Sequence, residues 1–242
     1  MFPKICHIGP FTIYSYGLML VIACVAGALL AGQRAKKEHV DPEVLINLSF
    51  FAFLAGVLGA RLFYVVENLR YYLHDPLEII MLQRGGLSWF GGLILGAAAA
   101  FLYLKKRKLP VYKILDIFAP YLALAQAIGR VGCLLNGCCY GKPSSHGIYF
   151  DSLGQVLIPT QAYSTLLLLT IFIVLRFFQD RPHKEGEIFF LYLLLYSVKR
   201  FCIEFWRADN AIIVSGLTLF QLLSIGIFLL SLYKLICIKK SR

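Results

Sequence analysis

Long apolar stretches separated by short polar segments dominate this chain. Seven of them are about 17 to 25 residues long, the length at which an α-helix crosses the hydrocarbon core of a bilayer. We expect helical spans at 13–31, 46–66, 87–104, 112–135, 161–178, 185–206 and 216–237. The pattern predicts an all-α polytopic membrane protein with about seven transmembrane helices. We expect residues 1–242 to form a single transmembrane domain.

Composition and charge agree with that fold class. Hydrophobic residues make up 59% of the chain, against about 45–50% in soluble domains. Lys and Arg alternate between the connecting segments, with 15 in one set and 5 in the other. The richer set belongs in the cytoplasm, which places the N-terminus outside and the C-terminus in the cytoplasm. The net charge of +11 is mostly this loop bias, so we expect no nucleic-acid partner.

Polar side chains within the predicted spans, or directly beside their ends, gather toward the outer side. They include Tyr16, Arg61, Arg130, Asn136, Gln161, Tyr196, Arg200, Glu204, Arg207 and Gln221. An arginine in hydrocarbon costs at least ~2.5–3.5 kcal/mol, so it indicates a functional site. For Arg61 alone, snorkelling or a structural ion pair explains the residue as well as ligand contact does. Together, Arg61, Arg130 and Arg200 predict a cationic site for a phosphate ester, such as an anionic lipid headgroup in the outer leaflet.

The sixth predicted span places four polar residues on one helical face. Tyr196, Arg200, Glu204 and Arg207 follow the spacing i, i+4, i+8 and i+11, which keeps side chains on the same side of a helix. Arg200 and Glu204 can pair there, which lowers the cost of burying either charge.

Residues 129–141 combine Arg130 with four glycines and three cysteines. The glycines allow close approach of backbones or a broken helix end beside a cavity. For Cys133, Cys138 and Cys139 we favour structural cysteines over a disulfide on an oxidising face, and that over a reactive thiol activated by Arg130. The C-x4-C-C spacing is unusual for zinc, and we expect neither a metal nor a cofactor.

Several different short motifs follow one another along nearly the whole chain. They are Tyr16–Met19, Gly59–Tyr64, Gly85–Gly92, Asp116 with Ala119 and Pro120, Gly129–Gly141, Pro159–Tyr163 and Tyr196–Arg207. In this order they resemble the motifs of bacterial prolipoprotein diacylglyceryl transferases, whose signature runs approximately G-R-x-G-N-x-x-N-G-E-x-x-G. The resemblance implies a multi-pass enzyme of the bacterial inner membrane. Such an enzyme transfers the diacylglyceryl group of phosphatidylglycerol to the lipobox cysteine of a prolipoprotein signal peptide, forms a thioether and releases glycerol phosphate.

The resemblance also implies roles for individual residues. Arg130 would bind the lipid phosphate, with help from Arg200 and Arg207, and these charges would stabilise the departing phosphate. Tyr16 and Asn136 would orient the headgroup or glycerol, and Glu204 would hold Arg200 or Arg207 in place. The resemblance thus assigns catalysis to Arg130, Arg200, Tyr16 and Glu204, and substrate binding to Arg130, Asn136, Gly137, Arg61, Gln161, Tyr196 and Arg207. The attacking thiol belongs to the substrate, so the enzyme needs no nucleophile of its own.

Four positions depart from the family pattern. Phe90 replaces a histidine that is a candidate base, Cys133 replaces the signature asparagine, Cys138 its glutamate, and Ser164 a further glutamate. The base therefore stays open between Tyr16, Tyr196, a cysteine, and the arginine field acting alone on the substrate thiol. We favour a divergent branch of the family. The alternatives are a paralogue with an altered substrate and a non-enzymatic protein that binds or moves anionic lipid.

Overall fold

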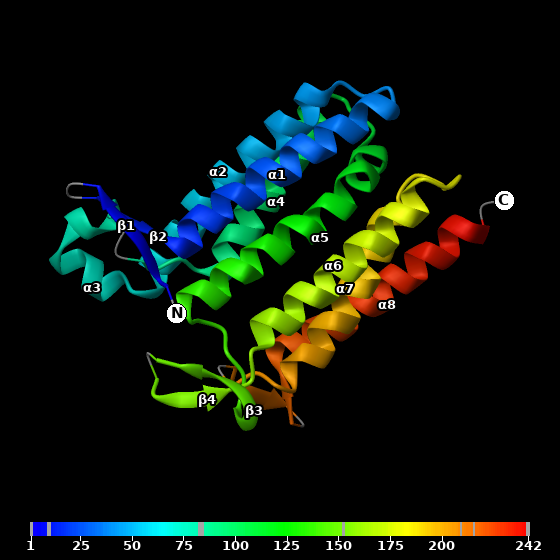
Figure 1. The fold of residues 1–242 in the computed structure, drawn as a ribbon. Coiled ribbons are helices and arrows are strands. Elements are labelled where there is room, and N and C mark those ends of the chain that lie inside the picture. Colours follow the sequence, from blue (N-terminus) through cyan, green and yellow to red (C-terminus); the bar gives the residue numbers. More distant parts are fainter. Residues whose placement is uncertain are drawn as a thin grey trace. The chain divides into compact units, whose positions relative to one another are not determined.

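The computed structural model describes residues 2–8, 11–81, 85–151, 153–208, 210–214 and 216–240. Within these ranges the chain is mostly helical and carries three two-stranded antiparallel sheets (Figure 1). The helices are α1 (Ser15–Lys37), α2 (Pro42–Glu67), α3 (Leu69–His74), the 3-10 helix η1 (Pro76–Ile79), α4 (Trp89–Lys106), α5 (Val111–Asn136), α6 (Thr160–Gln179), α7 (Glu187–Glu204) and α8 (Leu219–Lys240). The strands are β1 (Lys4–Ile8) with β2 (Phe11–Tyr14), β3 (Pro143–Phe150) with β4 (Gln155–Leu157), and β5 (Ile212–Val214) with β6 (Leu217–Thr218).

Five of the helices in the described ranges, α1, α2, α5, α6 and α8, are long and apolar enough to cross a membrane. The prediction of a mostly helical, multi-pass membrane protein is therefore confirmed at that level. Each of the seven predicted spans overlaps one long helix, the other two being α4 and α7 with 18 residues each. The three sheets were not predicted. The first helix begins at Ser15, not at residue 13, because residues 11–14 pair with β1.

The chain packs as two compact units, residues 1–27 with 115–242, and residues 28–114. In the first unit α7 packs against both α6 and α8 (Figure 1). In the second unit α2 packs against α4. A Cβ atom on Gly59 of α2 would lie only 2.5 Å from the carbonyl oxygen of Gly91 on α4. The two helices therefore approach at a distance that glycine permits and a larger residue does not.

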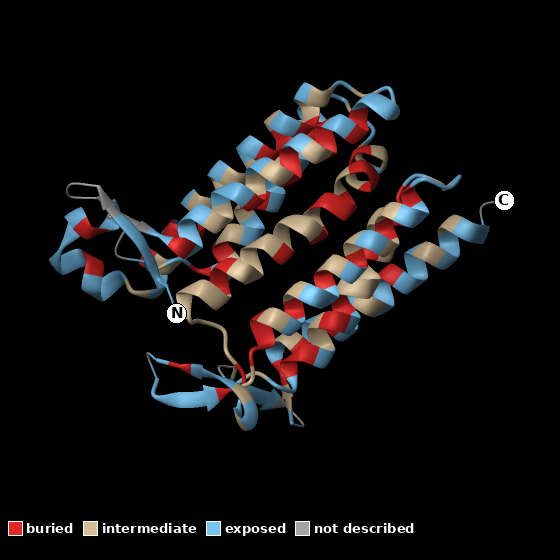
Figure 2. Ribbon diagram, in the orientation of Figure 1, coloured by how far each residue is buried: buried red, intermediate tan, exposed pale blue. Residues whose placement is uncertain are grey.

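The surface of the first unit inverts the usual soluble pattern. Along α8, Leu229 and Leu230 are more than half exposed, whereas Ser224 and Ser231 on the same helix are buried. Figure 2 shows most of this helix as exposed or intermediate. A soluble helix would bury its leucines and expose its serines. The buried hydroxyls return their hydrogen bonds to the carbonyl four residues earlier, Ser231 to Ile227 at 2.7 Å. This arrangement suits a helix with its apolar side facing lipid, because the hydroxyls need no water.

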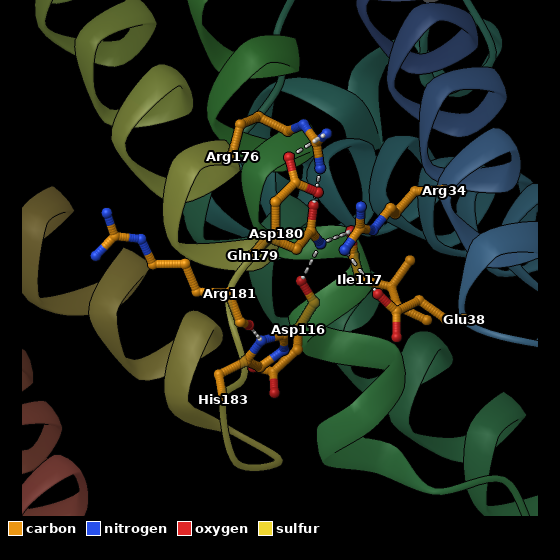
Figure 3. Close-up of polar contacts among 9 residues, drawn as sticks. All are labelled: Arg34, Glu38, Asp116, Ile117, Arg176, Gln179, Asp180, Arg181 and His183. Atoms are coloured by element: carbon orange, nitrogen blue, oxygen red, sulfur yellow. Dashed lines mark hydrogen bonds and ion pairs between the residues drawn. The ribbon is translucent and has the colours of Figure 1, made fainter.

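A polar network joins three helices of the first unit at the ends opposite the signature segment. Asp116 on α5 accepts hydrogen bonds from the backbone N–H groups of Gly186 at 2.5 Å and Phe189 at 2.8 Å, where α7 begins. Its carboxylate thereby satisfies orphan amides and faces the positive end of the helix dipole. Gln179 at the end of α6 donates to the Asp116 carbonyl at 2.9 Å, and Arg176 contacts Gln179 in turn (Figure 3). These contacts fix the relative positions of α5, α6 and α7.

Candidate active site

The signature segment begins inside α5 and ends in the turn that follows it. α5 ends at Asn136, and Gly137 adopts a φ of 73°. The N–H of Cys138 donates to the Cys133 carbonyl at 3.1 Å, and the N–H of Gly137 donates to the Leu134 carbonyl at 3.2 Å. These two bonds form a Schellman motif, which requires a left-handed residue at the position of Gly137. The structure accounts for Gly137 by this helix end, and its predicted contact with substrate stays a prediction.

The first turn of α6 holds the backbone beyond that helix end. Gln161 donates from Nε2 to the Cys138 carbonyl at 2.6 Å, and Thr160 donates from Oγ1 to the Cys139 carbonyl at 2.7 Å. Cys139 has a φ of 62°, an uncommon conformation for a residue with a side chain. Gln161 is fully buried, and its Oε1 has no hydrogen-bond partner among the described residues. It can therefore accept a hydrogen bond from a bound molecule.

The end of the signature segment is also tied to the chain that leaves α7. Gly141 donates to the Ile158 carbonyl at 2.9 Å and forms a β-bridge with Arg207, while the N–H of Lys142 donates to the Trp206 carbonyl at 2.8 Å. A Cβ atom on Gly141 would lie 2.6 Å from the Trp206 oxygen. Only glycine fits this crossing, so the bridge places Arg207 beside the signature segment.

Three thiols converge at the end of α5. The Sγ atoms of Cys133, Cys138 and Cys139 all lie within 4.8 Å of one another, and Cys133 is buried. The Cys138 thiol donates to the Cys133 carbonyl, with Sγ 3.7 Å from that oxygen, and the Asn136 side chain lies within reach of the same thiol. Hydrogen bonds from the Cys133 and Cys138 thiols lower the pKa of Cys139, and the charges of Arg130 and Arg207 act in the same direction against the effect of burial.

Two basic side chains of the first unit, Lys199 and Arg200, lie within electrostatic range of each other and of two further arginines. Arg130 acts on Lys199 and Arg200, and Arg207 acts on the same two groups. Tyr16, near the start of α1, lies within range of Arg130 and of the three thiols. Lys199 is buried and places its Nζ 5.0 Å from the ring centroid of Tyr196. Of the three arginines predicted to form a cationic site, Arg130 and Arg200 lie within range of each other, and Arg207, which the resemblance added, joins them. Their binding of a phosphate ester stays a prediction. Lys199 is an addition that its place inside a span could have signalled.

The predicted pair on α7 is present. Arg200 Nη2 lies 3.1 Å from Oε2 of Glu204, whose carboxylate is buried. The other oxygen, Oε1, accepts from Thr218 Oγ1 at 2.8 Å and from Asn210 Nδ2 at 2.6 Å. The Arg200 guanidinium also lies over the Phe220 ring, 4.3 Å from its centroid. The ion pair with Glu204 and the contact with Phe220 together hold the Arg200 guanidinium, and Oε2 of Glu204 has no hydrogen-bond partner among the described residues. Sequence reasoning missed Thr218 in β6, Asn210 in the loop before β5, and Phe220 in the first turn of α8, because none of them belongs to a motif.

Arg61 belongs to the second unit and bonds to backbone there. Its Nε donates to the Ile79 carbonyl at 2.9 Å, and its Nη2 donates to the backbone carbonyl of Glu78. Its Nη1 donates to the carbonyls of Gly85 at 2.6 Å and Gly86 at 3.0 Å. Four of the five guanidinium N–H groups can be used in these contacts. Of the two interpretations left open for Arg61, the geometry favours a structural one. A role in phosphate binding stays a prediction.

Comparisons with known proteins agree with the motifs. The family described as prolipoprotein diacylglyceryl transferase matches residues 3–237. A phosphatidylglycerol–prolipoprotein diacylglyceryl transferase of Clostridium tetani is 33% identical over 244 residues, covering 96% of this chain and 98% of the relative. Transferase 2 of that name from Clostridium perfringens is 34% identical over 235 residues, covering 92% of each. A Staphylococcus aureus relative with the same name is 33% identical, and the alignment covers 95% of this chain and 86% of the relative. This chain therefore belongs to the prolipoprotein diacylglyceryl transferase family.

Proposed function

We propose that the basic group beside the signature segment binds the phosphate of phosphatidylglycerol and that the chain transfers its diacylglyceryl group to the lipobox cysteine of a prolipoprotein signal peptide. Membership of the family makes the chain a transferase of lipoprotein biosynthesis. The observation that carries the proposal is the gathering of Arg130, Arg200 and Arg207 around one helix end. The relatives' names disfavour the alternative of a non-enzymatic lipid-binding protein.

We propose a single domain with seven spans, formed by α1, α2 and α4–α8, in the bacterial inner membrane with the N-terminus outside. α4 and α7 join the five apolar helices because each packs along a neighbour that is long enough to cross. Basic residues occupy the last turns of α1, α4 and α8. In this topology those turns face the cytoplasm, whereas the start of α1, the end of α5, the start of α6 and the end of α7 face outward. That alternation brings the site residues to the outer leaflet.

The reaction replaces one bond on a glyceryl carbon with another. The substrate sulfur forms a bond to that carbon while the carbon–oxygen bond to phosphate breaks, and the electron pair leaves on the phosphate oxygen. Negative charge grows on the departing phosphate, so fixed positive groups stabilise the transition state more than the ground state. Arg130 and Arg200 supply that charge, and Glu204 holds Arg200 in one direction. We place Tyr16, Asn136 and Tyr196 around the headgroup and assign the Oε1 of Gln161 to a glycerol hydroxyl.

A transfer assay tests the function directly. It combines purified protein, phosphatidylglycerol labelled in its acyl chains, and a synthetic lipobox peptide. We expect label on the peptide cysteine and none on a peptide with serine in its place. Arg130→Ala should lower the rate by about 100- to 1,000-fold, the usual loss when a group that stabilises developing charge is removed. Arg107→Ala, which removes an exposed arginine at the end of α4, is the matched control. Folded protein that never labels the peptide would refute the proposed function.

A further inference from the structure

The three thiols at the end of α5 have the spacing of a metal site. A zinc ion holds thiolate sulfurs at about 2.3 Å in a tetrahedron, which puts the sulfurs about 3.8 Å from one another. The Sγ atoms of Cys133, Cys138 and Cys139 already lie within 4.8 Å of one another. Small changes in side-chain torsion would close them around one ion. The C-x4-C-C spacing gave no reason to expect this, because it is the Schellman turn that folds Cys138 and Cys139 back toward Cys133.

The surroundings hold these thiols in place. The Cys138 and Cys139 carbonyls accept hydrogen bonds from Gln161 and Thr160, and the Cys138 thiol donates to the Cys133 carbonyl with the Asn136 side chain within reach. Such outer contacts orient the ligands of a metal and are part of its binding site. Three thiolates around a divalent ion leave one negative charge. Arg130 and Arg207 lie within electrostatic range of the Cys139 sulfur and would offset it.

The proposed reaction needs a group that removes the proton of the substrate thiol. Glu204 pairs its charge with Arg200 through Oε2 and accepts hydrogen bonds from Thr218 and Asn210 through Oε1, so it already serves as the counter-charge of Arg200. Tyr16 and Tyr196, two of the bases left open by the sequence, are phenols, and a phenol with its usual pKa of about 10 is almost entirely protonated at pH 7 and accepts a proton poorly. A free cysteine thiol with a pKa of about 8.5 is only about 3% thiolate at pH 7. The site therefore gains from any group that holds the substrate sulfur as a thiolate.

We propose that Cys133, Cys138 and Cys139 bind a zinc ion whose fourth position takes the thiol of the substrate cysteine. The inference rests on the proposed function and identifies how that site activates its second substrate. Three protein ligands with one open position are the usual form of a catalytic zinc site. Metal coordination deprotonates a thiol.

The chemical step then balances without a redox change. The substrate thiol gives its proton to water as its sulfur binds zinc. The zinc-bound thiolate attacks the glyceryl carbon, the carbon–oxygen bond to phosphate breaks, and the phosphate leaves with the electron pair. The product sulfur is a thioether, a weaker zinc ligand than a thiolate, so it dissociates and the next thiol binds.

Metal content tests the site independently of activity. The purified full chain is stripped of metal with a chelator and reloaded with zinc, and its zinc content is measured by elemental mass spectrometry. A second sample is loaded with cobalt(II) and examined for sulfur-to-cobalt charge-transfer absorption. We expect one zinc per chain and strong absorption. Cys133→Ser, Cys138→Ser or Cys139→Ser should each remove most of both signals, whereas Cys202→Ser, at an exposed position on α7, should keep them. Wild-type protein that binds no zinc or cobalt, or binds only copper(I), overturns the proposal without the need for any variant.

Measurements with added substrate peptide distinguish a catalytic zinc ion from a structural one. Lipobox peptide should change the cobalt spectrum, whereas the peptide with serine in place of cysteine should not. Removing zinc should slow transfer by about 30-fold at pH 7 and by less than about twofold at pH 9, where a free thiol is already mostly ionised. Equal rates with and without zinc at pH 7 overturn the proposal. A peptide-sensitive cobalt spectrum with no transfer to the peptide would instead refute the transferase function while the metal site stood.

Discussion

Replacing Glu204 with glutamine tests whether this carboxylate positions Arg200. Glutamine keeps an oxygen that can accept from Thr218 and Asn210 but loses the charge that lies 3.1 Å from Arg200. The carboxylate is fully buried and the Arg200 side chain is only 11% exposed, so water replaces little of the lost interaction. Removing one member of a buried pair costs about 3–5 kcal/mol because the other charge stays buried. We expect the lower end of that range, since the Phe220 ring still contacts the guanidinium.

The same substitution should also slow transfer. An arginine displaced by about 1 Å from the phosphate can cost on the order of 100-fold in rate. Thermal unfolding and transfer kinetics measured in one detergent give both quantities. We expect kcat to fall more than KM rises, because the correctly directed charge matters most as the phosphate departs.

Two control variants test whether the loss comes from the charge of Glu204. Thr218→Val removes a hydrogen bond to Glu204 but no charge, so it should cost about 1 kcal/mol of stability and little activity. Glu43→Gln removes the exposed carboxylate that follows the Asp41 cap of α2 and should change neither quantity measurably. If Glu204→Gln unfolds like the wild type and transfers at an unchanged rate, the carboxylate does not position Arg200.

Three further predictions follow from contacts outside that pair. Gly141→Ala should destabilise the protein by more than about 1 kcal/mol, because the new methyl group meets backbone that must shift; Gly129→Ala, with nothing within 4 Å of the added carbon, should be neutral or stabilising in thermal unfolding. Asp116→Asn should cost about 1–2 kcal/mol, since a neutral amide interacts less well with the start of α7; an unchanged melting temperature would contradict this. In metal-free protein, Cys139 should keep reacting with iodoacetamide as the pH falls to 6, because the lowered pKa of Cys139 preserves its thiolate. The reaction of Cys202 should slow over the same range. Mass spectrometry of the labelled peptides measures both rates, and equal slowing would contradict the prediction.

Much of the helical framework could be predicted from the sequence. Each predicted span overlaps a long helix because lipid satisfies no backbone group and therefore favours helices wherever an apolar run is long enough. The ends were less accurate. Residues 216–218, placed in the last span, form a turn and β6 before α8 begins. Short sheets escape such reasoning because two or three residues per strand leave no periodic pattern, and their partners are chosen by the packing of the connecting loops.

Within the site, the sequence by itself determined the local relations. Arg200 and Glu204 pair because four residues make about one turn of a helix, and Arg130 lies near a helix end because the apolar run stops just beyond it. Only the tertiary structure decided the rest. It brought Thr218 to Glu204, turned Arg61 toward backbone carbonyls, and gathered Cys133, Cys138 and Cys139 around one point. Those contacts depend on where a chain reverses and what packs against the turn, and both follow from the free energy of the whole fold.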